Sequence, residues 1–378
     1  MRVLHVFKTY MPETYGGIER VINSIAGSTA ALGVESTVLS LGRQTDTAGN
    51  VDGHRVLTGK RDIEFASTGF SRDFIRLLRR EAAEHDLINY HFPWPFMDFS
   101  HFAARINTKY VVTYHSDIIR QRNLLKLYRP LMRRFLREAD RLIATSENYV
   151  STSPTLKEYA DKVEIIPPGI EDVANGDPDS DLIETWRGRF PRSFFLYTGV
   201  LRYYKGLSFL VDAALAVDVD ILIVGAGPEE ARLRALASAK GADNVHFLGR
   251  LDEADKYALL SLCDGFVFPS HLRSEAYGMS LVEAAMMSKP MICCEIGTGT
   301  SFINVNEETG LVVPPESSAD IANAINRLSR SPEEASRFGR MARRRYEELL
   351  TADRMGRVYK ALYQNVLNSE DRRQIISQ

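Results

Sequence analysis

Short runs of β-branched and aromatic residues alternate along the chain with amphipathic segments, in which apolar residues recur every three or four positions. The first half contains the runs VLHVF, STVLSL, LINYHF, YVVTYH and RLIATS, and the second half contains FFLYTG, DILIVG, NVHFLG, GFVFPS and PMICC. Short apolar runs separated by helical patterns are typical of βαβ units that build a parallel sheet. The pattern therefore predicts an α/β protein.

The alternation pauses once, in a stretch rich in Pro, Gly, Asp and Asn at roughly residues 168–182. Such a composition is typical of a linker, and a chain of 378 residues is longer than one hydrophobic core usually supports. We therefore expect two Rossmann-like, doubly wound parallel-sheet domains, at residues 1–170 and 185–350. Two such domains facing each other would form a ligand cleft at the carboxyl ends of their strands.

The last segment, 352–378, spaces Met355, Val358, Leu362 and Val366 at intervals of three and four. This spacing predicts a helix with one apolar face, which is a candidate to pack back on the first domain. The two ends of the chain would then belong to the same domain.

Composition and charge narrow the classes of function. The formal net charge is −2, so the chain has no general electrostatic attraction to nucleic acid. The cysteines Cys263, Cys293 and Cys294 offer no CxxC spacing, which favours a reducing compartment and no structural zinc. The N-terminus lacks a signal-peptide core and no stretch approaches ~20 apolar residues, so we expect a cytoplasmic protein that can still lie on a membrane surface.

Two glycines and a histidine are the candidate site residues of the first half. Gly16 and Gly17 precede a helical pattern, and at a helix start they would let the backbone approach a phosphate closely. A plain tight turn explains these glycines equally well. His115 closes the run YVVTYH, although a lone histidine is more often a structural hydrogen-bonding residue than a catalytic one.

In the second half, Arg202 and Lys205 follow the run FFLYTG, at the mouth of the next predicted helix. Two cations at the carboxyl end of a strand can clamp a diphosphate, while solvated surface charge is the alternative. The nearby stretch GAGPEE has Glu230 where a dinucleotide fingerprint has its third glycine, so the sequence supports a Rossmann dehydrogenase only weakly.

Two glutamates with seven residues between them, Glu275 and Glu283, follow the run GFVFPS. With Glu275 in the loop and Glu283 inside the helix, their backbones would lie of order 10 Å apart, which is wide for a retaining glycosidase pair. Two separate roles on one elongated ligand fit better, one glutamate holding a hexose and the other a ribose. The phosphates between them would meet the amides of Tyr277, Gly278 and Met279. The alternative is that Glu275 caps the helix and Glu283 is a surface residue.

The stretch EAYGMSLVEA resembles the E-x7-E signature of the retaining glycosyltransferases of family 4, which have the GT-B fold. The stretches YGGIERV, VVTYHSD, IIPPGIE, YYKGL and TGLVVPP occur in that family's order along nearly the whole chain. One such motif would be weak evidence, but six in order are strong. YHSDI, LLKLYRP and GTGTSFIN are further similar to a subgroup of bacterial enzymes that build O-antigen and related polysaccharides, many of them mannosyltransferases that use GDP-mannose.

For the first domain, the acceptor side, the resemblance implies that Gly16 and Gly17 contact the donor diphosphate. It also implies that His115 lies beside the sugar, where a hydrogen bond from it can stabilise the transition state. The family transfers with retention and usually without a metal, because cations of the protein do the work that magnesium does elsewhere. We therefore expect no cofactor and no metal, with GDP-mannose as the donor substrate.

For the second, donor-binding domain, the resemblance implies that Lys205, with Arg202, neutralises charge on the departing nucleotide. Glu275 would hold hydroxyls of the transferred sugar, and Glu283 would hold the ribose. Family members commonly place an arginine directly after the strand's glycine, where this chain has Val200. The neutralising role therefore rests more on Lys205 than on Arg202.

Residues 118–137 read IIRQRNLLKLYRPLMRRFLR and contain no acidic residue. A basic, leucine-bearing segment can lie on anionic lipid, which would bring the active site to a lipid-linked oligosaccharide on the cytoplasmic face of the inner membrane. We expect Pro130 to divide the segment into two pieces. A solvated helix face is the alternative. A second basic cluster in the same half consists of Arg72, Arg76, Arg79 and Arg80.

The sequence thus predicts a retaining hexosyltransferase that moves mannose from GDP-mannose to a lipid-linked glycan in lipopolysaccharide O-antigen or exopolysaccharide biosynthesis. One alternative is a transferase that takes glucose, N-acetylglucosamine or rhamnose from UDP or another nucleotide. Another is a synthase with a soluble acceptor, which the basic segment disfavours. The non-enzyme alternative is an inactive sugar-nucleotide binding module, which the intact set of candidate residues disfavours.

Overall fold

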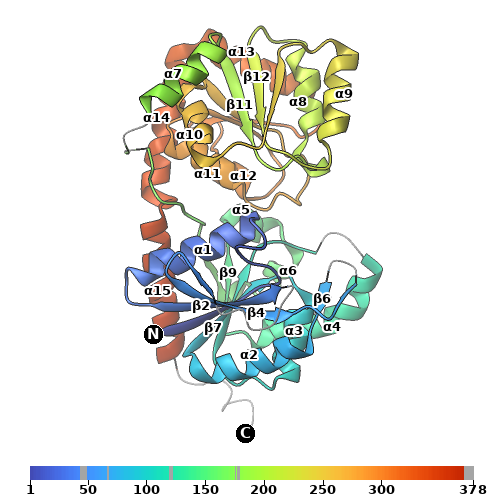
Figure 1. The fold of residues 1–378 in the computed structure, drawn as a ribbon, viewed down its shortest axis with the longest axis vertical. Helices are drawn as coiled ribbons and strands as arrows, with labels where there is room; N and C mark the ends of the chain where they lie inside the picture. Colours follow the sequence, from blue (N-terminus) through green and yellow to red (C-terminus); the bar gives the residue numbers. More distant parts are fainter. Residues whose placement is uncertain (43–48, 66–67, 119–121, 175, 177–178, 370–378) are drawn as a thin grey trace. The chain divides into compact units, whose positions relative to one another are not determined.

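The computed structural model describes residues 1–42, 49–65, 68–118, 122–174, 176 and 179–369, and the chain forms two compact units (Figure 1). The first unit contains Met1–Thr145, Ser153–Gly169 and Ala352–Gln378, and the second contains Ser146–Thr152 and Ile170–Thr351. The second unit therefore begins at Ile170, earlier than the expected residue 185, and it also takes a short segment from the first half of the chain.

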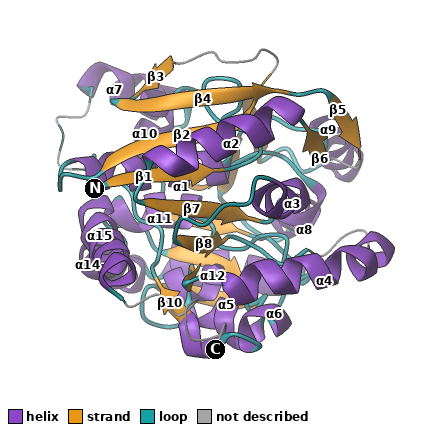
Figure 2. Ribbon diagram, turned by 90° about the horizontal axis from the view of Figure 1, so that it is seen from below, coloured by secondary structure: helices purple, strands orange, loops and turns teal. Residues whose placement is uncertain are grey.

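The first unit is built on an eight-stranded sheet. Its strands are β1 (Arg2–Val6), β2 (Glu35–Gly42), β3 (Gly49–Val51), β4 (His54–Lys60), β7 (Leu87–Phe92), β8 (Tyr110–Tyr114), β9 (Arg141–Ala144) and β10 (Val163–Ile165). They lie in the order β10-β9-β8-β7-β1-β2-β4-β3, and all pairs are parallel except β3 with β4. Figure 2 shows the central strands side by side in this order. A separate two-stranded sheet contains β5 (Ile63–Phe65) and β6 (Thr68–Phe70).

The helices of the first unit complete a layered α/β arrangement. They are α1 (Gly17–Ala30), α2 (Arg72–Glu84), α3 (Pro95–Ala103), α4 (Arg122–Glu138), α6 (Pro154–Lys157) and α15 (Ala352–Asn368), with a 3₁₀ turn at Ala160–Lys162. The central strand β7 is buried at all six positions. A strand of a covered parallel sheet is buried on both faces, so its sequence is largely apolar, and the polar exceptions in β7 are Asn89 and His91.

Helix α15 packs side by side with α1 (Figure 1). The two backbones approach closely at Gly356, where a Cβ atom would lie 2.7 Å from the carbonyl oxygen of Ser28. The buried apolar residues of α15 include Met355, Tyr359, Leu362 and Val366. Val358, which the spacing placed on the apolar face, is instead 37% exposed. Tyr359 takes its place because positions i, i+4, i+7 and i+11 follow one stripe of a helix.

A polar network fixes α15 on the sheet. Asn89 of β7 donates from Nδ2 to the hydroxyl of Tyr363 at 2.8 Å, and Thr113 of β8 donates from Oγ1 to Oδ1 of Asn89 at 2.8 Å. The Thr113 hydroxyl also lies 3.3 Å from the Tyr359 hydroxyl. All four side chains are buried, so their polar atoms depend on these partners rather than on water.

The second unit is built on a six-stranded parallel sheet with the order β13-β12-β11-β14-β15-β16. Its strands are β11 (Phe194–Thr198), β12 (Asp220–Val224), β13 (Val245–Gly249), β14 (Gly265–Phe268), β15 (Met291–Cys294) and β16 (Gly310–Val313). Its helices are α5 (Glu147–Thr152), α7 (Ser180–Arg189), α8 (Leu207–Ala214), α9 (Glu230–Lys240), α10 (Glu253–Leu262), α11 (Met279–Met286), α12 (Gly299–Ile303), α13 (Ser318–Arg330) and α14 (Pro332–Leu349), with a 3₁₀ turn at Tyr203–Lys205. The predicted fold class, two Rossmann-like parallel-sheet domains, is confirmed.

The glycines of GAGPEE serve backbone packing in the loop after β12. A Cβ atom at Gly225 would lie 1.9 Å from the carbonyl oxygen of Gly199, and one at Gly227 would lie 2.4 Å from that of Leu201. Glycine is therefore required for the loops after β11 and β12 to lie in direct contact. The loop after β11 is the one that carries Lys205.

We expect Asn89→Ala to lower the free energy of unfolding by about 1–3 kcal/mol, because the buried hydroxyls of Tyr363 and Thr113 each lose a partner. Urea unfolding followed by circular dichroism measures the change. The matched control is Gln364→Ala, on the exposed side of α15, which should stay within about 0.5 kcal/mol of wild type. Equal stability of Asn89→Ala and the control would contradict the importance of this network.

Candidate active site

Lys205 and Glu275 form an ion pair at the carboxyl ends of β11 and β14. The Lys205 Nζ atom donates to Oε2 of Glu275 at 2.5 Å, and each side chain is only 11% exposed. Ser270 also donates to Oε2, at 3.2 Å, and Nζ lies 4.6 Å from the ring centroid of Phe268. Glu275 therefore does not cap α11, whose N-cap is Gly278 without a side-chain cap.

Tyr197, near the end of β11, is a residue of this site that the sequence reasoning missed. Its hydroxyl is buried and has no hydrogen-bond partner among the described residues. Burial, together with the negative charge of Glu275, raises the pKa of Tyr197 well above its usual value. A Cβ atom at Gly199 would lie 2.9 Å from the Tyr197 hydroxyl and 3.9 Å from Nζ of Lys205, so both groups lie close to Gly199. In the sequence, the position of Tyr197 near the end of the strand run FFLYTG is the signal that could have identified it as a site residue.

Glu283 lies inside α11 and is buried, so it is not a surface residue. Its Oε1 atom accepts a hydrogen bond from Nζ of Lys256 at 2.9 Å, and the two side chains are 8% and 10% exposed. Lys256, in α10, also pairs with Glu253 at 2.6 Å. This partner could not be identified from the sequence, because Lys256 is distant from Glu283 along the chain.

The start of α11 has backbone donors without a side-chain cap. Gly278 holds the N-cap position in the left-handed region, with φ 102°, and the helix begins at Met279. The first N–H groups of a helix have no acceptor within it, so they can bind an anion. Tyr277 precedes them, with its side chain buried against Gly299, where a Cβ atom would lie 2.4 Å from the tyrosine ring.

Arg202 does not share the ion pair of Lys205. Its side chain is exposed, and within the described part of the chain it forms no salt bridge. The two cations are therefore unequal, because Lys205 is already held by Glu275 whereas the guanidinium of Arg202 faces solvent. A clamp made by both cations stays a prediction.

In the first unit, α1 begins at Gly17 with Gly16 as its N-cap. Glu19 turns back toward this helix start and accepts hydrogen bonds from the hydroxyls of Thr9 and Thr14 at 2.8 and 2.9 Å. A Cβ atom at Gly16 would lie 2.4 Å from Oε2 of Glu19, so the carboxylate fills the space a larger residue would need. An anion of the protein thus already lies at the helix start, and the predicted phosphate contact is untested.

His115 follows β8 and is hydrogen-bonded to another histidine. Its Nε2 atom lies 2.9 Å from Nδ1 of His91, whose Nε2 lies 3.1 Å from Nδ1 of His5. Burial lowers the pKa of His115 to about 3. From the sequence, His115 is interpreted as a lone histidine. His5 and His91 lie inside the strand runs VLHVF and LINYHF, and their positions near the ends of neighbouring runs are the signal that could have placed them beside His115.

Residues 122–137 of the basic segment lie in one helix rather than in two pieces. Pro130 lies inside α4, so the expected break is wrong. The buried residues Phe135 and Leu136 pack the second half of the helix on the unit, and such packing can outweigh the hydrogen bond that a proline removes. Residues 119–121 of the segment lie outside the described part of the chain.

Several arginines of the two basic clusters have acidic or carbonyl partners. Arg133 donates to both carboxylate oxygens of Glu158, at 2.7 and 3.1 Å. Further partners exist for Arg129, Arg134, Arg76, Arg79 and Arg80. Leu127 is 84% exposed, and Arg137 is exposed as well. Part of the local positive charge is thus compensated.

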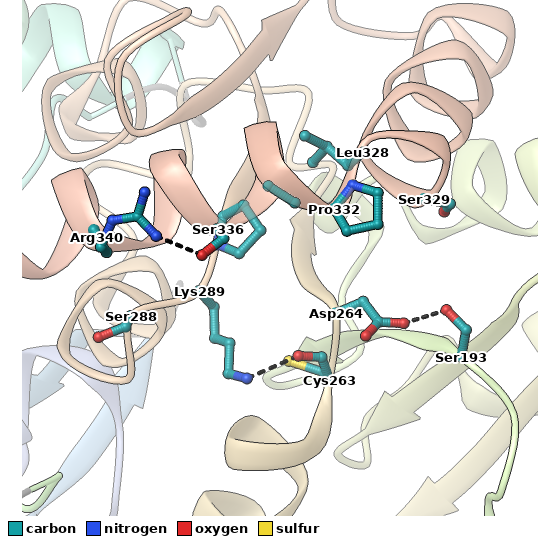
Figure 3. A pocket seen from close by; sticks show the side chains of 12 residues that line it. Ser193, Cys263, Asp264, Ser288, Lys289, Leu328, Ser329, Pro332, Ser336 and Arg340 are labelled. Carbon is teal, nitrogen blue, oxygen red and sulfur yellow. Dashed lines mark hydrogen bonds between the residues drawn. The ribbon is translucent and has the colours of Figure 1, made fainter.

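The pocket in Figure 3 lies in the second unit and contains none of the predicted site residues. Lys289, which lines the pocket, donates to the carbonyl oxygens of Ser261 and Cys263 at 2.8 Å each. It thereby satisfies carbonyl groups at the C-terminal end of α10. No group of three or more His, Cys, Asp or Glu side chains suited to a metal ion occurs among the described residues. In the same part of the chain, no helix has the length and apolar character needed to cross a membrane.

Two family descriptions match the chain. Residues 15–174 match "Glycosyltransferase Family 4", and residues 187–345 match "Glycosyl transferases group 1". The D-rhamnosyltransferase WbpZ of Pseudomonas aeruginosa is 52% identical over 93% of this chain and 93% of its own length. The O-antigen chain mannosyltransferase C of Escherichia coli is 47% identical over 98% of this chain and 100% of its own length.

Among solved structures, the sucrose-phosphate synthase of Thermosynechococcus elongatus is similar with a TM-score of 0.80. The match covers 96% of this chain and 99% of that chain, at 22% sequence identity. At this identity the likeness concerns the fold alone.

The buried histidines should make the stability of the protein dependent on pH. Burial lowers the pKa of His5 and His115 to about 3, and that of His91 well below its usual value. An unfolded histidine has a pKa of about 6.5, so below this pH the unfolded chain binds protons that the folded chain does not. The stability that these neutral rings contribute is complete above about pH 6.5 and is lost as the pH falls toward 3.

We therefore expect the free energy of unfolding, measured by urea denaturation, to decrease as the pH is lowered from 7 to 5. The decrease should be up to about 1.4 kcal/mol per pH unit for each histidine. His91→Phe should flatten this slope, because one titrating group is removed. A wild-type midpoint that stays constant over this range would show that the histidines are not held neutral.

Proposed function

The chain belongs to the family 4 glycosyltransferases, and we propose that this hexosyltransferase of GT-B fold moves mannose from GDP-mannose, with retention, to a lipid-linked glycan in O-antigen biosynthesis. The observation that carries the proposal is the 47% identity to the O-antigen chain mannosyltransferase C, which extends over nearly the whole of both chains. The GDP moiety is supported by the resemblance of the motifs to GDP-mannose enzymes.

D-Rhamnose is the second candidate for the transferred sugar, because the D-rhamnosyltransferase WbpZ is 52% identical to the chain. D-Rhamnose is D-mannose without the hydroxyl on C6, so the two sugars share the configuration at every other carbon. Both relatives therefore support a site for a manno-configured hexose, and the C6 hydroxyl is the feature that distinguishes them.

In the proposed reaction, the ion pair of Lys205 and Glu275 is exchanged for contacts to the donor. Lys205 turns to the diphosphate and neutralises the charge that develops as the nucleotide departs, while Glu275 accepts hydrogen bonds from hydroxyls of the sugar. The Tyr197 hydroxyl, which lies close to Gly199 as Lys205 Nζ does, has no partner among the described residues. The donor thus supplies Lys205 and Glu275 with partners that take the place of their contact with each other.

The remaining donor contacts belong to α11 and the loop after β11. The amides of Tyr277, Gly278 and Met279 bind phosphate oxygens at the uncapped helix start, and Arg202 adds a second positive charge from solvent. Glu283 holds the ribose hydroxyls, with its carboxylate positioned by the hydrogen bond from Lys256. We propose that these cations and amides replace a metal, so that transfer needs no magnesium.

The first unit contributes Gly16, Gly17 and His115 to the proposed reaction. The N–H groups at the start of α1 would contact the diphosphate in place of the Glu19 carboxylate, which lies there in the structure. His115 donates a hydrogen bond beside the reacting carbon. Its burial keeps the ring neutral, so it acts as a hydrogen-bond donor without a full charge.

We expect purified protein to transfer sugar from GDP-mannose to a lipid-linked acceptor in the presence of EDTA, and Glu275→Gln to lose on the order of a hundredfold or more in rate. The glutamine keeps the shape of the side chain but cannot accept from both sugar hydroxyls or balance Lys205. Glu333→Gln, an exposed change on α14, is the matched control. Transfer by Glu275→Gln at a near-normal rate would remove the proposed mechanism, and GDP-D-rhamnose as the better substrate would favour the second candidate.

We also propose that α4 brings the protein to anionic lipid of the inner membrane, because Leu127, Arg134 and Arg137 are exposed on it. Arg133 is left out of the test, since its pairing with Glu158 gives it a structural role.

Wild type should cosediment at low salt with phosphatidylglycerol-containing vesicles and not with pure phosphatidylcholine. The double variant Arg134→Glu/Arg137→Glu should bind several-fold more weakly, because two attractive charges become repulsive. Arg232→Glu/Arg330→Glu, in the second unit, changes the net charge equally and should bind like wild type. Equal losses in both double variants would show that only net charge matters, and no loss in either would exclude α4.

A further inference from the structure

Four polar side chains form a continuous hydrogen-bonded row across the sheet of the first unit. Ser36 on β2 lies 3.5 Å from Nε2 of His5 on β1, and Nδ1 of His5 lies 3.1 Å from Nε2 of His91 on β7. Nδ1 of His91 lies 2.9 Å from Nε2 of His115, directly after β8. The rings also stack, with centroids 5.4 Å apart for His5 and His91 and 5.2 Å apart for His91 and His115.

The strand register explains why these residues meet. Ser36 lies opposite Val3, His5 opposite Asn89, and His91 opposite Thr113. His5 therefore lies two residues after Val3, the residue opposite Ser36. In the same way, His91 lies two residues after Asn89, and His115 lies two residues after Thr113. Since side chains two apart share a face of a strand, the row runs diagonally over one face of four adjacent strands. It ends at His115, where the strands have their carboxyl ends.

The surroundings of the row exclude water from its rings, so the rings form hydrogen bonds with one another. His5 and His91 are fully buried and His115 is 6% exposed. Phe7 packs against both His91 and His115, with ring centroids 6.5 Å away. The neighbouring polar residues on this face, Asn89 and Thr113, are hydrogen-bonded to one another and to tyrosines of α15.

A neutral imidazole has one nitrogen that donates and one that accepts. In a row of neutral rings, the direction of one hydrogen bond therefore fixes the direction of all the others, and only two ordered forms exist. In one form the Ser36 hydroxyl donates to His5 and the outer nitrogen of His115, Nδ1, bears the proton. In the other form every proton is reversed, and Nδ1 of His115 presents a lone pair. Burial disfavours a charged ring, which would place two donors against each other.

We propose that His5 and His91 are positioning residues, which hold His115 in the tautomer with its proton on Nδ1, so that this nitrogen donates to the sugar during transfer. The inference rests on the proposed role of His115 in the reaction. The order that begins with the Ser36 hydroxyl is the one that gives His115 an outward N–H group. Within the described residues, no hydrogen bond engages that nitrogen, so it is available to a substrate.

The test combines ¹⁵N NMR of the histidine rings with steady-state kinetics in His91→Phe and His91→Gln. The phenylalanine keeps an aromatic ring but cannot bond to His115, whereas the glutamine amide can both donate and accept. In wild type, the ¹⁵N shifts should show His115 protonated on Nδ1. In His91→Phe this tautomer should be lost or mixed, and kcat should fall about tenfold or more with little change in the KM for the donor. His91→Gln should recover part of both signals.

His101→Phe is the matched control, because His101 is also buried but is hydrogen-bonded to Tyr90, whose side chain points to the opposite face of β7 from His91. It should leave the tautomer of His115 and kcat unchanged.

An unchanged His115 tautomer in His91→Phe would overturn the proposal, and so would a changed tautomer with normal kcat. If His115→Ala itself retains full activity, the proposed role of His115 fails instead, and the NMR result still reports separately on the row.

Discussion

The ion pair between Lys205 and Glu275 is the contact on which the candidate donor site depends. Both side chains are nearly dry, at 11% exposure each, and a buried charge without a partner costs several kcal/mol. In the structure each residue therefore compensates the charge of the other. A ligand with phosphates and hydroxyls side by side can take over both tasks at once, which is the composition of a nucleotide sugar. The same argument explains why Glu283 is held by Lys256.

The two units solve the burial of polar groups in different ways. The second unit places charges at the carboxyl ends of β11 and β14 and pairs them with opposite charges. The first unit keeps its row of histidines neutral, so no countercharge is needed and hydrogen bonds alone satisfy the rings. Both arrangements follow from parallel strands, because residues of neighbouring strands that share a face come together at the same edge of the sheet.

Much of the fold could be predicted from the sequence, because parallel strands buried on both faces leave continuous apolar runs. The run LINYHF is β7 residue for residue. The strand β4 was missed because its sequence HRVLTGK has only two large apolar residues, Val56 and Leu57, and contains a glycine, and β10 was missed because it has only three residues. Pro130 was misread because local propensity favours a break there, whereas packing of the residues that follow it continues the helix.

The site was predictable only in part. Glu275, Glu283 and Lys205 could be singled out because they follow strands at a recognisable spacing, but spacing does not identify partners. The contact of Lys205 with Glu275 joins residues from different loops, and Lys256, Tyr197, His5 and His91 reach the site residues only through the arrangement of the sheets. Tertiary contacts of this kind depend on strand order, which a single sequence does not determine.

The measurement that tests this account most directly is isothermal titration of the purified protein with GDP, UDP, TDP and ADP, each with and without EDTA. The account predicts that GDP binds most tightly, that EDTA leaves its affinity unchanged, and that Glu275→Gln still binds GDP because the glutamate holds the sugar rather than the nucleotide. Tighter binding of another nucleotide would contradict the assignment of GDP-mannose. Binding that EDTA abolishes, or no binding of any nucleotide, would contradict the donor site itself.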